Sequence, residues 1–260
     1  MATLRERLRD GQTVIGSWVN TASPIVAEIM AGAGFDFLAV DAEHSAVEVP
    51  AAQQLFQAIR SGSPDCTPLV RLPGCEYDVI KRYCDAGAQG VVAPLVNTPA
   101  QARAVVDAVK YPPMGRRGVG FCRDNDYGAD FDEAVASAND RTLVCVQIEH
   151  IDAVDDIEAI LAVDGVDATF IGPYDLSASM DLTGRTDHPR VQQACERVLQ
   201  ASLEAGVAPG LHVVQPDASA VVERARQGYR LIAYSLDITM LTTACRDGLA
   251  AIREGLDGQV

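Results

Sequence analysis

The chain has 260 residues, of which 48% are hydrophobic and 5% aromatic, and a formal net charge of −15. This length allows one large domain or two small ones, and the apolar content is sufficient for a sizeable core. The acidic balance argues against binding to nucleic acid or to anionic membranes, since both require basic patches. No linker or low-complexity segment interrupts the chain, so we expect residues 1–260 to form one domain.

The cysteines indicate a reducing environment. Seven of them are dispersed without CxxC spacing, which is typical of free thiols rather than of a disulfide framework: Cys66, Cys75, Cys84, Cys122, Cys145, Cys195 and Cys245. The opening MATLRERLRDG is charged and helix-prone and lacks an apolar signal region. No stretch approaches the roughly 20 apolar residues that cross a bilayer. We therefore expect a cytoplasmic protein that does not bind a membrane.

Apolar runs and amphipathic stretches alternate along the whole chain. The runs predict strands over 13–19, 35–41, 68–72, 90–96, 143–149, 168–172, 208–213 and 231–236. The stretches between them predict helices over 24–32, 50–61, 76–86, 99–110, 152–162, 189–206, 216–227 and 239–254. Proline in the first turn of several helices and glycine after the last turn support these boundaries.

The strand pattern favours one fold class. Continuous rather than alternating apolar runs indicate strands that are buried on both faces, as in a parallel sheet covered by helices. Eight βα units in a chain of this length predict an α/β fold of the closed (β/α)8 TIM-barrel type. An open doubly wound sheet is the alternative, but no GxGxxG or Walker sequence is present. Residues 111–140 form a long polar connection, which we expect to be a functional loop near the mouth or a neighbouring subunit.

Chemically capable side chains end several of the predicted strands. They are Asp41 and His44 after the second strand, Arg71 on the third, Gln147 and Glu149 on the fifth, and Asp175 after the sixth. In a barrel the carboxyl ends of the strands meet at one face, where catalytic groups gather. Gln147 and Glu149 are two residues apart and therefore point to the same side of their strand. The sequence thus predicts an active-site face.

These residue types suit proton abstraction beside a carbonyl. Two carboxylates, water and a bidentate substrate complete the oxygen shell of Mg²⁺ or Mn²⁺. An arginine balances a carboxylate or a developing enolate, and a histidine serves as a base near neutral pH. Each residue also has a structural alternative. Asp175 could cap a helix, Arg71 could form an ion pair with Asp41 or Glu43, and His44 could be an ordinary loop residue.

Several other chemistries are disfavoured. Schiff-base catalysis requires a lysine at a strand end, whereas Lys81 and Lys110, the two lysines of the chain, fall in predicted helices. Neither a GxSxG nor an HExxH sequence occurs, which argues against a serine hydrolase and a zincin.

At these residues the chain resembles the metal-dependent (class II) pyruvate aldolases of the 4-hydroxy-2-oxoheptanedioate aldolase and 2-dehydro-3-deoxyglucarate aldolase family. The resemblance extends from residue 16 to about residue 240. The motifs that carry it are AGAGFDFLAVDAEH (31–44), VRLP (70–73), DAGAQGVVAPLVNT (85–98), YPPMGRRGVG (111–120), VQIE (146–149) and FIGPYDLSAS (170–179). It implies a (β/α)8 barrel, a homohexamer or other homo-oligomer, a swapped C-terminal helix, and a carbon–carbon lyase acting on a small 2-oxo acid.

The resemblance also implies roles for individual residues. Glu149 and Asp175 would be ligands of a divalent metal (Mg²⁺, Mn²⁺ or Co²⁺). Arg71 would bind the keto oxygen and stabilise a pyruvate enolate, and His44, oriented by Asp85, would be the acid–base group. Substrate-binding positions would be Trp18 at the pocket mouth, Gln147, the backbone of Gly172, Pro173 and Tyr174, and His212. Asp41 would support Arg71 or the metal's waters.

The acceptor side of the site departs from the family pattern. The segment 121–128 is unusual, Tyr174 replaces a small residue, and His212 occupies a position that is usually apolar. An alternative function is therefore a citrate-synthase-like or other Claisen-type condensation, with Arg123 and His212 receiving an anionic electrophile. A catalytically silent binding protein with the same fold is a third possibility. The aldehyde, the stereochemistry and the preferred metal are left open by the sequence.

Overall fold

The computed structural model describes residues 2–129 and 131–257. Eight parallel strands form one closed barrel in chain order, with β8 paired to β1. The strands are β1 (Val14–Val19), β2 (Phe37–Asp41), β3 (Thr67–Arg71), β4 (Gly90–Ala93), β5 (Leu143–Ile148), β6 (Ala168–Ile171), β7 (Ala208–Val213) and β8 (Leu231–Leu236). The predicted (β/α)8 barrel is confirmed, and the open-sheet alternative is excluded by the closure.

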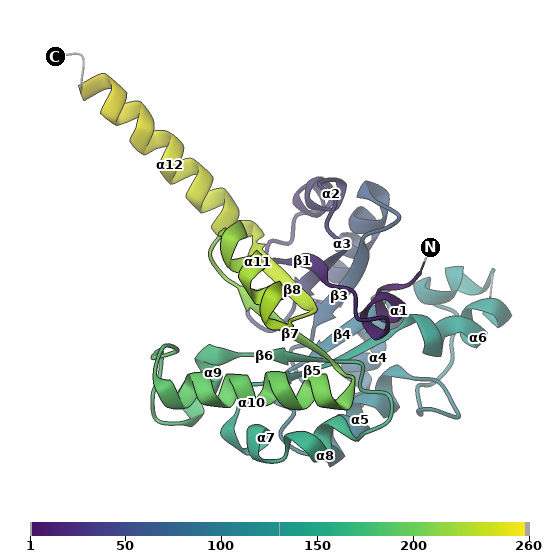
Figure 1. Cartoon of the computed structure of the whole chain (residues 1–260). Coiled ribbons are helices and arrows are strands. Elements are labelled where there is room, and N and C mark those ends of the chain that lie inside the picture. Colours follow the sequence, from purple (N-terminus) through teal and green to yellow (C-terminus); the bar gives the residue numbers. More distant parts are fainter. Residues whose placement is uncertain (1, 130, 258–260) are drawn as a thin grey trace.

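Helices surround the barrel in the alternating order that the sequence predicts (Figure 1). They are α1 (Leu4–Arg9), α2 (Pro24–Gly32), α3 (Val49–Gly62), α4 (Tyr77–Asp85), α5 (Pro99–Val109), α6 (Phe131–Arg141), α7 (Ile151–Asp155), α8 (Ile157–Leu161), α9 (Pro173–Ser179), α10 (Pro189–Ala205), α11 (Ala218–Gln227) and α12 (Asp237–Asp257), with a 3-10 helix η1 (Arg123–Gly128). One predicted helix, 152–162, is divided into α7 and α8 at Asp156, whose φ and ψ of −98° and 13° are not helical. None of the helices in the described ranges is both long and apolar enough to cross a membrane.

Side chains fill the barrel in an alternating pattern. Every second residue of a strand points inward, and the buried interior is made of Val14, Trp18, Phe37, Ala39, Leu69, Val92, Leu143, Cys145, Ala168, Phe170, Ala208, Leu231 and Ala233. A larger apolar layer packs between the strands and the helices. The interior is tight at Gly16, because an added Cβ would lie 2.4 Å from the ring of Phe37. The same alternation places Asp41, Arg71 and Gln147 on the inner face, above this core.

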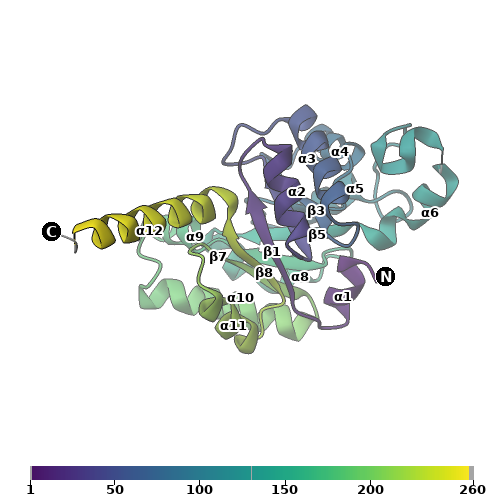
Figure 2. The ribbon, with the colours of Figure 1, turned by 90° about the horizontal axis from the view of Figure 1, so that it is seen from above.

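The segment 111–140 differs from the expected loop. It contains α6, which packs against α1, and η1, which contacts α4. Figures 1 and 2 show α6 on the side of the molecule that carries α1, away from α12. Because α1 precedes β1, this is the amino end of the barrel. The expectation that the segment reaches over the mouth is therefore wrong within this chain. The helix was missed because FDEAVASANDR buries only Ala138 and shows a weak apolar pattern.

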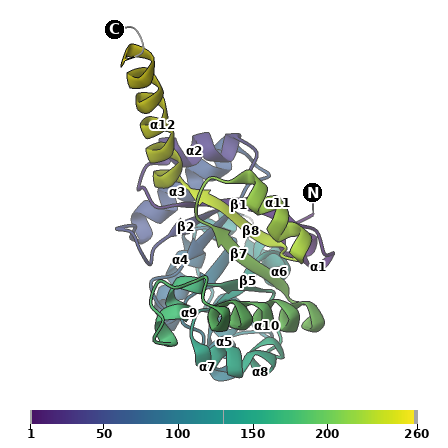
Figure 3. The same ribbon diagram turned by 60° about the vertical axis from the view of Figure 1, so that its left-hand side comes forward.

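The last helix leaves the barrel. In Figure 3, α12 extends beyond β1 and β8, whereas α10 and α11 lie along the barrel wall. Its exposed side chains include large apolar ones: Ile238, Leu241, Leu249, Ile252 and Leu256. An apolar stripe of this kind is normally covered by another part of the protein or by a partner. The exchange of this helix between subunits stays a prediction, and burial of these side chains would be its driving force.

Candidate active site

A cavity of about 640 Å³ opens at the carboxyl ends of the strands. Its volume falls in the range of small-molecule sites, about 300–1,000 Å³. The predicted site residues that line it are Trp18, His44, Arg71, Gln147, Gly172, Pro173, Tyr174, Asp175 and His212. Residues that are distant in the sequence meet here because each of them lies at or just after the end of a strand.

Arg71 is anchored from below by Asp41. The two residues are paired in the register of β2 and β3, and both point inward. Nε and Nη2 of Arg71 donate to Asp41 Oδ1 and Oδ2 at 2.9 and 2.6 Å. The guanidinium also lies 4.5 Å from the ring centroid of Trp18, as a cation–π contact. Arg71 thus forms the ion pair with Asp41 that the sequence offered as a structural alternative. This ion pair orients the arginine and leaves Nη1 without a protein acceptor among the described residues.

Asp41 stays ionised despite its burial. Burial alone would raise its pKa, but the hydrogen bonds and the charge of Arg71 outweigh burial. The N–H groups of Glu43 and His44 donate to the same carboxylate at 3.1 and 3.2 Å. The net result is an Asp41 pKa below its usual value. This carboxylate therefore fixes the start of the 42–44 segment as well as the arginine.

Glu149 is held in a defined orientation at the end of β5. The amide of Gln147 donates to Oε2, and the N–H of Leu95 donates to Oε1 at 2.7 Å. Leu95 adopts a left-handed φ of 52°, which aims its N–H at the carboxylate. Burial raises the pKa of Glu149, the two hydrogen bonds oppose this, and the charge of Asp175 adds to the increase. A nearby cation would favour the ionised form.

Asp175 faces the cavity from the third position of α9, where Gly172 is the N-cap. Its side chain makes no hydrogen bond or ion pair within the described residues, so the capping alternative is not what the structure shows. A side chain at position 172 would collide with Glu149, because a Cβ there would lie 2.9 Å from both Cβ and Oε2 of that residue. Glycine therefore lets the two acidic residues approach. In 2–129 and 131–257, no group of three or more His, Cys, Asp or Glu residues is arranged to hold a metal.

His44 and Asp85 do not meet within this chain. The side chain of His44 is 61% exposed, and its Nε2 lies 3.9 Å from Glu43 Oε2. Asp85 is the last residue of α4 and forms ion pairs with Lys81 and Arg117 at 2.8 and 2.7 Å. Since α4 runs antiparallel to the strands, it carries Asp85 to the amino end of the barrel, whereas His44 follows the carboxyl end of β2. The expected orientation of His44 by Asp85 is therefore not made by one chain alone.

Trp18 and His212 form the floor of the cavity. Trp18 is 3% exposed and packs edge-on against Phe170, so it lies at the floor rather than at the expected mouth. The Nε2 of His212 lies 3.0 Å from the carbonyl oxygen of Ser235. Burial lowers the pKa of His212 to about 4, and the nearby charge of Arg71 contributes to this. The imidazole is neutral near pH 7, and because a carbonyl only accepts, Nε2 carries the proton and Nδ1 is an acceptor.

Glu43, which the sequence offered as an ion-pair partner of Arg71, lies 3.4 Å from its Nε. Two other residues, Leu95 and Arg224, escaped the sequence reasoning. Leu95 acts through its backbone, which no residue type reveals. Arg224 lines the cavity from α11. Arg123 instead packs beside Gly87 at the end of α4, so its expected place in the acceptor region is not observed in this chain.

The fold and the site together define a class of protein. Asp175, an anchored arginine and an exposed histidine line a cavity at the carboxyl face of a (β/α)8 barrel, and a second acidic side chain, Glu149, is buried beside its wall. Such a set can bind a 2-oxo acid and stabilise negative charge on its oxygen. These are the features of a barrel enzyme that acts beside a carbonyl group.

Comparison with known proteins identifies the family. Residues 14–244 match the family described as HpcH/HpaI aldolase/citrate lyase. The chain is 36% identical to a hydroxypyruvate/pyruvate aldolase of Roseobacter denitrificans, over 97% of this chain and 98% of the relative. It is also 36% identical to a 4-hydroxy-2-oxovalerate aldolase of Novosphingobium aromaticivorans, over 99% and 97%. A crystal structure of an HpcH/HpaI aldolase/citrate lyase family protein from Burkholderia cenocepacia superposes with a TM-score of 0.92 at 37% identity, over 96% of this chain and 98% of that one.

The chain therefore belongs to the HpcH/HpaI aldolase/citrate lyase family. It is a carbon–carbon lyase of the aldolase type, as the resemblance of its sequence predicted. The third possibility, a catalytically silent protein, is disfavoured, because Arg71 and Asp175 line the cavity and Glu149 is held beside it.

Proposed function

We propose that the protein interconverts a 4-hydroxy-2-oxo acid with pyruvate and an aldehyde, and that it requires a divalent cation (Mg²⁺, Mn²⁺ or Co²⁺). The observation that carries the proposal is that Asp175 and Arg71 line one cavity, while Glu149 is buried directly beside its wall, against Gln147 and Gly172. Relatives that match over nearly their whole length are a hydroxypyruvate/pyruvate aldolase and a 4-hydroxy-2-oxovalerate aldolase, which supports the same chemistry.

The residues present fit a cation. Glu149 is oriented by two hydrogen bonds, Asp175 has no protein partner among the described residues, and Oε1 of Gln147 is buried without one. All three offer the oxygen atoms that hard cations prefer. Glu149 and Asp175 would hold the ion, with Gln147 close by, and the remaining positions would go to substrate and water. When bound, the cation would supply Lewis-acid polarisation of the keto oxygen.

The other steps belong to the side chains of the site. The backbone of Gly172 to Asp175 would hold the substrate carboxylate through the N–H groups of Tyr174 and Asp175, because Pro173 has no N–H and that of Gly172 donates to Ile148. Nη1 of Arg71 would donate to the keto oxygen and stabilise the enolate as the bond between C3 and C4 breaks. His44 would accept the proton of the 4-hydroxyl group, through water because it is exposed. Trp18 and His212 would bound the substrate from the floor.

A homo-oligomer fits the same proposal. The exposed apolar side chains of α12 would be buried if this helix packed on another copy of the chain. We propose that the protein is an oligomer, of which the hexamer is the expected form, and that its place is the cytoplasm. The substrates are small molecules, and one domain carries the whole site.

The test is the exchange of the C3 protons of pyruvate, together with oxaloacetate decarboxylation, after chelation and after addition of Mn²⁺. We expect both activities to disappear with the chelator and to return with the metal. Glu149→Gln and Asp175→Asn should remove the metal-dependent activity, and Arg71→Ala should remove catalysis while the fold persists. Exchange that needs no divalent ion, or that survives either acidic substitution, would refute the proposal.

Use of different electrophiles separates the aldol reaction from the Claisen-type alternative. Condensation with simple aldehydes would support the aldolase. Condensation with oxaloacetate or a CoA thioester, without turnover of any aldehyde, would favour the alternative, because the enolate would be the same and only the electrophile would differ.

A further inference from the structure

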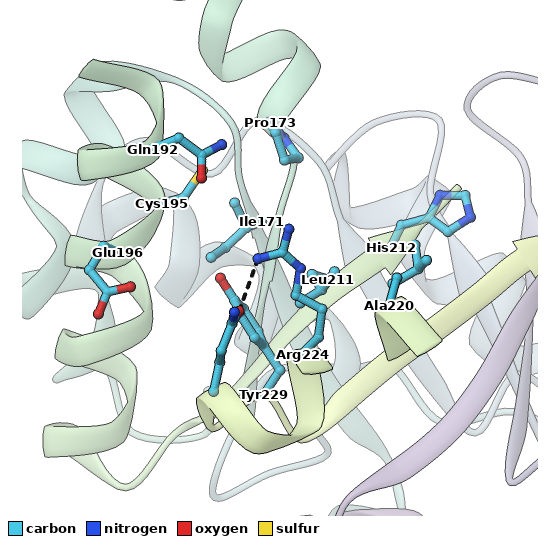
Figure 4. A pocket seen from close by; sticks show the side chains of 12 residues that line it. Ile171, Pro173, Gln192, Cys195, Glu196, Leu211, His212, Ala220, Arg224 and Tyr229 are labelled. Carbon is cyan, nitrogen blue, oxygen red and sulfur yellow. Dashed lines mark hydrogen bonds between the residues drawn. The ribbon is translucent and has the colours of Figure 1, made fainter. Parts of the chain in front are cut away.

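The active-site cavity extends sideways between α10 and α11. A second hollow of about 190 Å³ lies there and shares part of its lining with the cavity. The shared residues are Ile171, Pro173, Gln192, His212, Val213, Ala220 and Arg224. Figure 4 shows this region, with His212 on one side and Arg224 projecting between the strand ends and α10. A substrate longer than pyruvate would run from the catalytic residues toward this side.

Arg224 is a cation without an acidic partner within the described chain. The one hydrogen bond of its guanidinium is to Gln227 Oε1, from Nη1 at 2.9 Å. No carboxylate in 2–129 or 131–257 lies within ion-pair distance of it. Arg71, the other arginine that lines the cavity, is neutralised by Asp41 and Glu43. Of the two arginines that line the cavity, Arg224 is therefore the one without an ion-pair partner in the described residues.

The acidic groups nearby form no ion pair with Arg224 in the part of the chain that the structure describes. Asp217 lines the cavity but serves as the N-cap of α11, accepting from the N–H groups of Ser219 and Ala220 at 2.9 and 3.2 Å. Glu196 lines the side hollow but not the main cavity, and it accepts from Gln200 at 2.7 Å. Gln192, Gln215 and Asp217 line the same cavity as Arg224, and Asp217 is engaged by the backbone of α11 and forms no ion pair with Arg224 within the described ranges.

We propose that Arg224 binds an anionic group, a carboxylate or a phosphate, at the far end of the acceptor aldehyde. The inference rests on the proposed aldol function and names the class of its second substrate. In the condensing direction, C3 of the pyruvate enolate attacks the aldehyde carbon and forms the new C–C bond. The C=O π bond opens, and its oxygen takes a proton to become the 4-hydroxyl group. The anionic end takes no part in these steps, so Arg224 is a specificity-determining residue.

Matched pairs of acceptors test the inference. Butanal and succinate semialdehyde differ by a terminal carboxylate, and glyceraldehyde and its 3-phosphate differ by a phosphate. With the unmodified protein we expect a lower KM for the charged member of one pair. Arg224→Gln should raise that KM about tenfold. This factor is at the lower end of the range for the loss of a charge-assisted hydrogen bond, because the contact is open to water. Its kcat should change less than twofold, and the neutral aldehyde of the same pair should be unaffected in both constants. Arg224→Lys should restore part of the preference.

Arg226→Gln is the control, because Arg226 lies on the same helix, is exposed, and lines neither hollow. It removes the same charge and should leave unchanged the ratio of the KM values for the charged and the neutral acceptor of a pair. The pair of acceptors in which Arg224→Gln loses the preference for the charged member, the carboxylate pair or the phosphate pair, identifies which anion binds. The inference would be overturned if Arg224→Gln had the same KM values for charged and neutral acceptors as the unmodified protein. It would also be overturned if the substitution raised the KM of the charged and the neutral acceptor by the same factor. Pyruvate proton exchange in the unmodified protein keeps the two proposals separate. If metal restores exchange and no charged acceptor is preferred, the subsite alone has failed.

Discussion

The pair formed by Asp41 and Arg71 offers the sharpest test of how the site is held. Asp41→Asn keeps the size of the side chain but replaces one carboxylate oxygen with an N–H donor. That donor would face Nε or Nη2 of Arg71, which now donate at 2.9 and 2.6 Å. The variant therefore loses one charge-assisted hydrogen bond and leaves the guanidinium short of an anion, a change we expect to be destabilising.

The magnitude follows from burial. Breaking a buried ion pair costs about 3–5 kcal/mol. Here the lower end applies, because the Arg71 side chain is 17% exposed and Glu43 remains 3.4 Å from its Nε. We expect Asp41→Asn to lower the free energy of unfolding by about 3 kcal/mol. Arg71→Met should cost about 2 kcal/mol, since Asp41 keeps three donors, from Asn20, Glu43 and His44.

A double-mutant cycle measured by urea denaturation, at one protein concentration for all variants, isolates the interaction. The double variant should be about 2 kcal/mol more stable than the sum of the single losses predicts. Because the pKa of Asp41 is lowered in the folded protein, the stabilisation should be constant above the usual carboxyl pKa and lost as the pH falls through the lowered one. Single effects that add within about 0.5 kcal/mol would show that the two residues do not stabilise each other.

Two further predictions concern the cavity walls. His212 has a pKa lowered to about 4 from 6.5, so the unfolded chain binds a proton in this interval that the folded protein does not. Stability should therefore fall by about 3 kcal/mol between pH 6.5 and 4 through this group, and His212→Gln should lose less over the same interval in urea titrations. An identical pH dependence of the two proteins would contradict the lowered pKa. Gly172→Ala would place a Cβ 2.9 Å from Glu149, displacing that carboxylate. We expect Mn²⁺ affinity, measured by calorimetry, to fall about tenfold, whereas Gly11→Ala, which meets nothing within 4 Å but has a positive φ, should affect stability and leave the metal affinity intact. Unchanged Mn²⁺ affinity in Gly172→Ala would argue against Glu149 as a ligand.

Much of the barrel follows from the sequence alone. The eight apolar runs predict the strands within three residues at every end, because burial on both faces selects continuous apolar residues. The same alternation of side chains carries Asp41, Arg71 and Glu149 to one face. Asp41 and Arg71 close their strands and Glu149 follows β5, each with the same parity as its inward-pointing neighbours. A local periodicity was sufficient for these residues because the strand geometry is fixed by the backbone.

The tertiary structure decided the contacts between residues that are far apart in the sequence, which a local pattern does not predict. Leu95 orients Glu149 through a backbone N–H at a residue with left-handed φ. A leucine side chain does not predict such a role, because the contact is made by the backbone. Asp85 carries the expected residue type but lies at the opposite end of the barrel from His44, because α4 returns antiparallel to the strands. Arg224 reaches the cavity from α11, the element that follows β7, the strand on which His212 lies. Sequence fixes which residues can do chemistry; the packing of helices on the barrel fixes which of them meet, because those distances depend on contacts far apart in the chain.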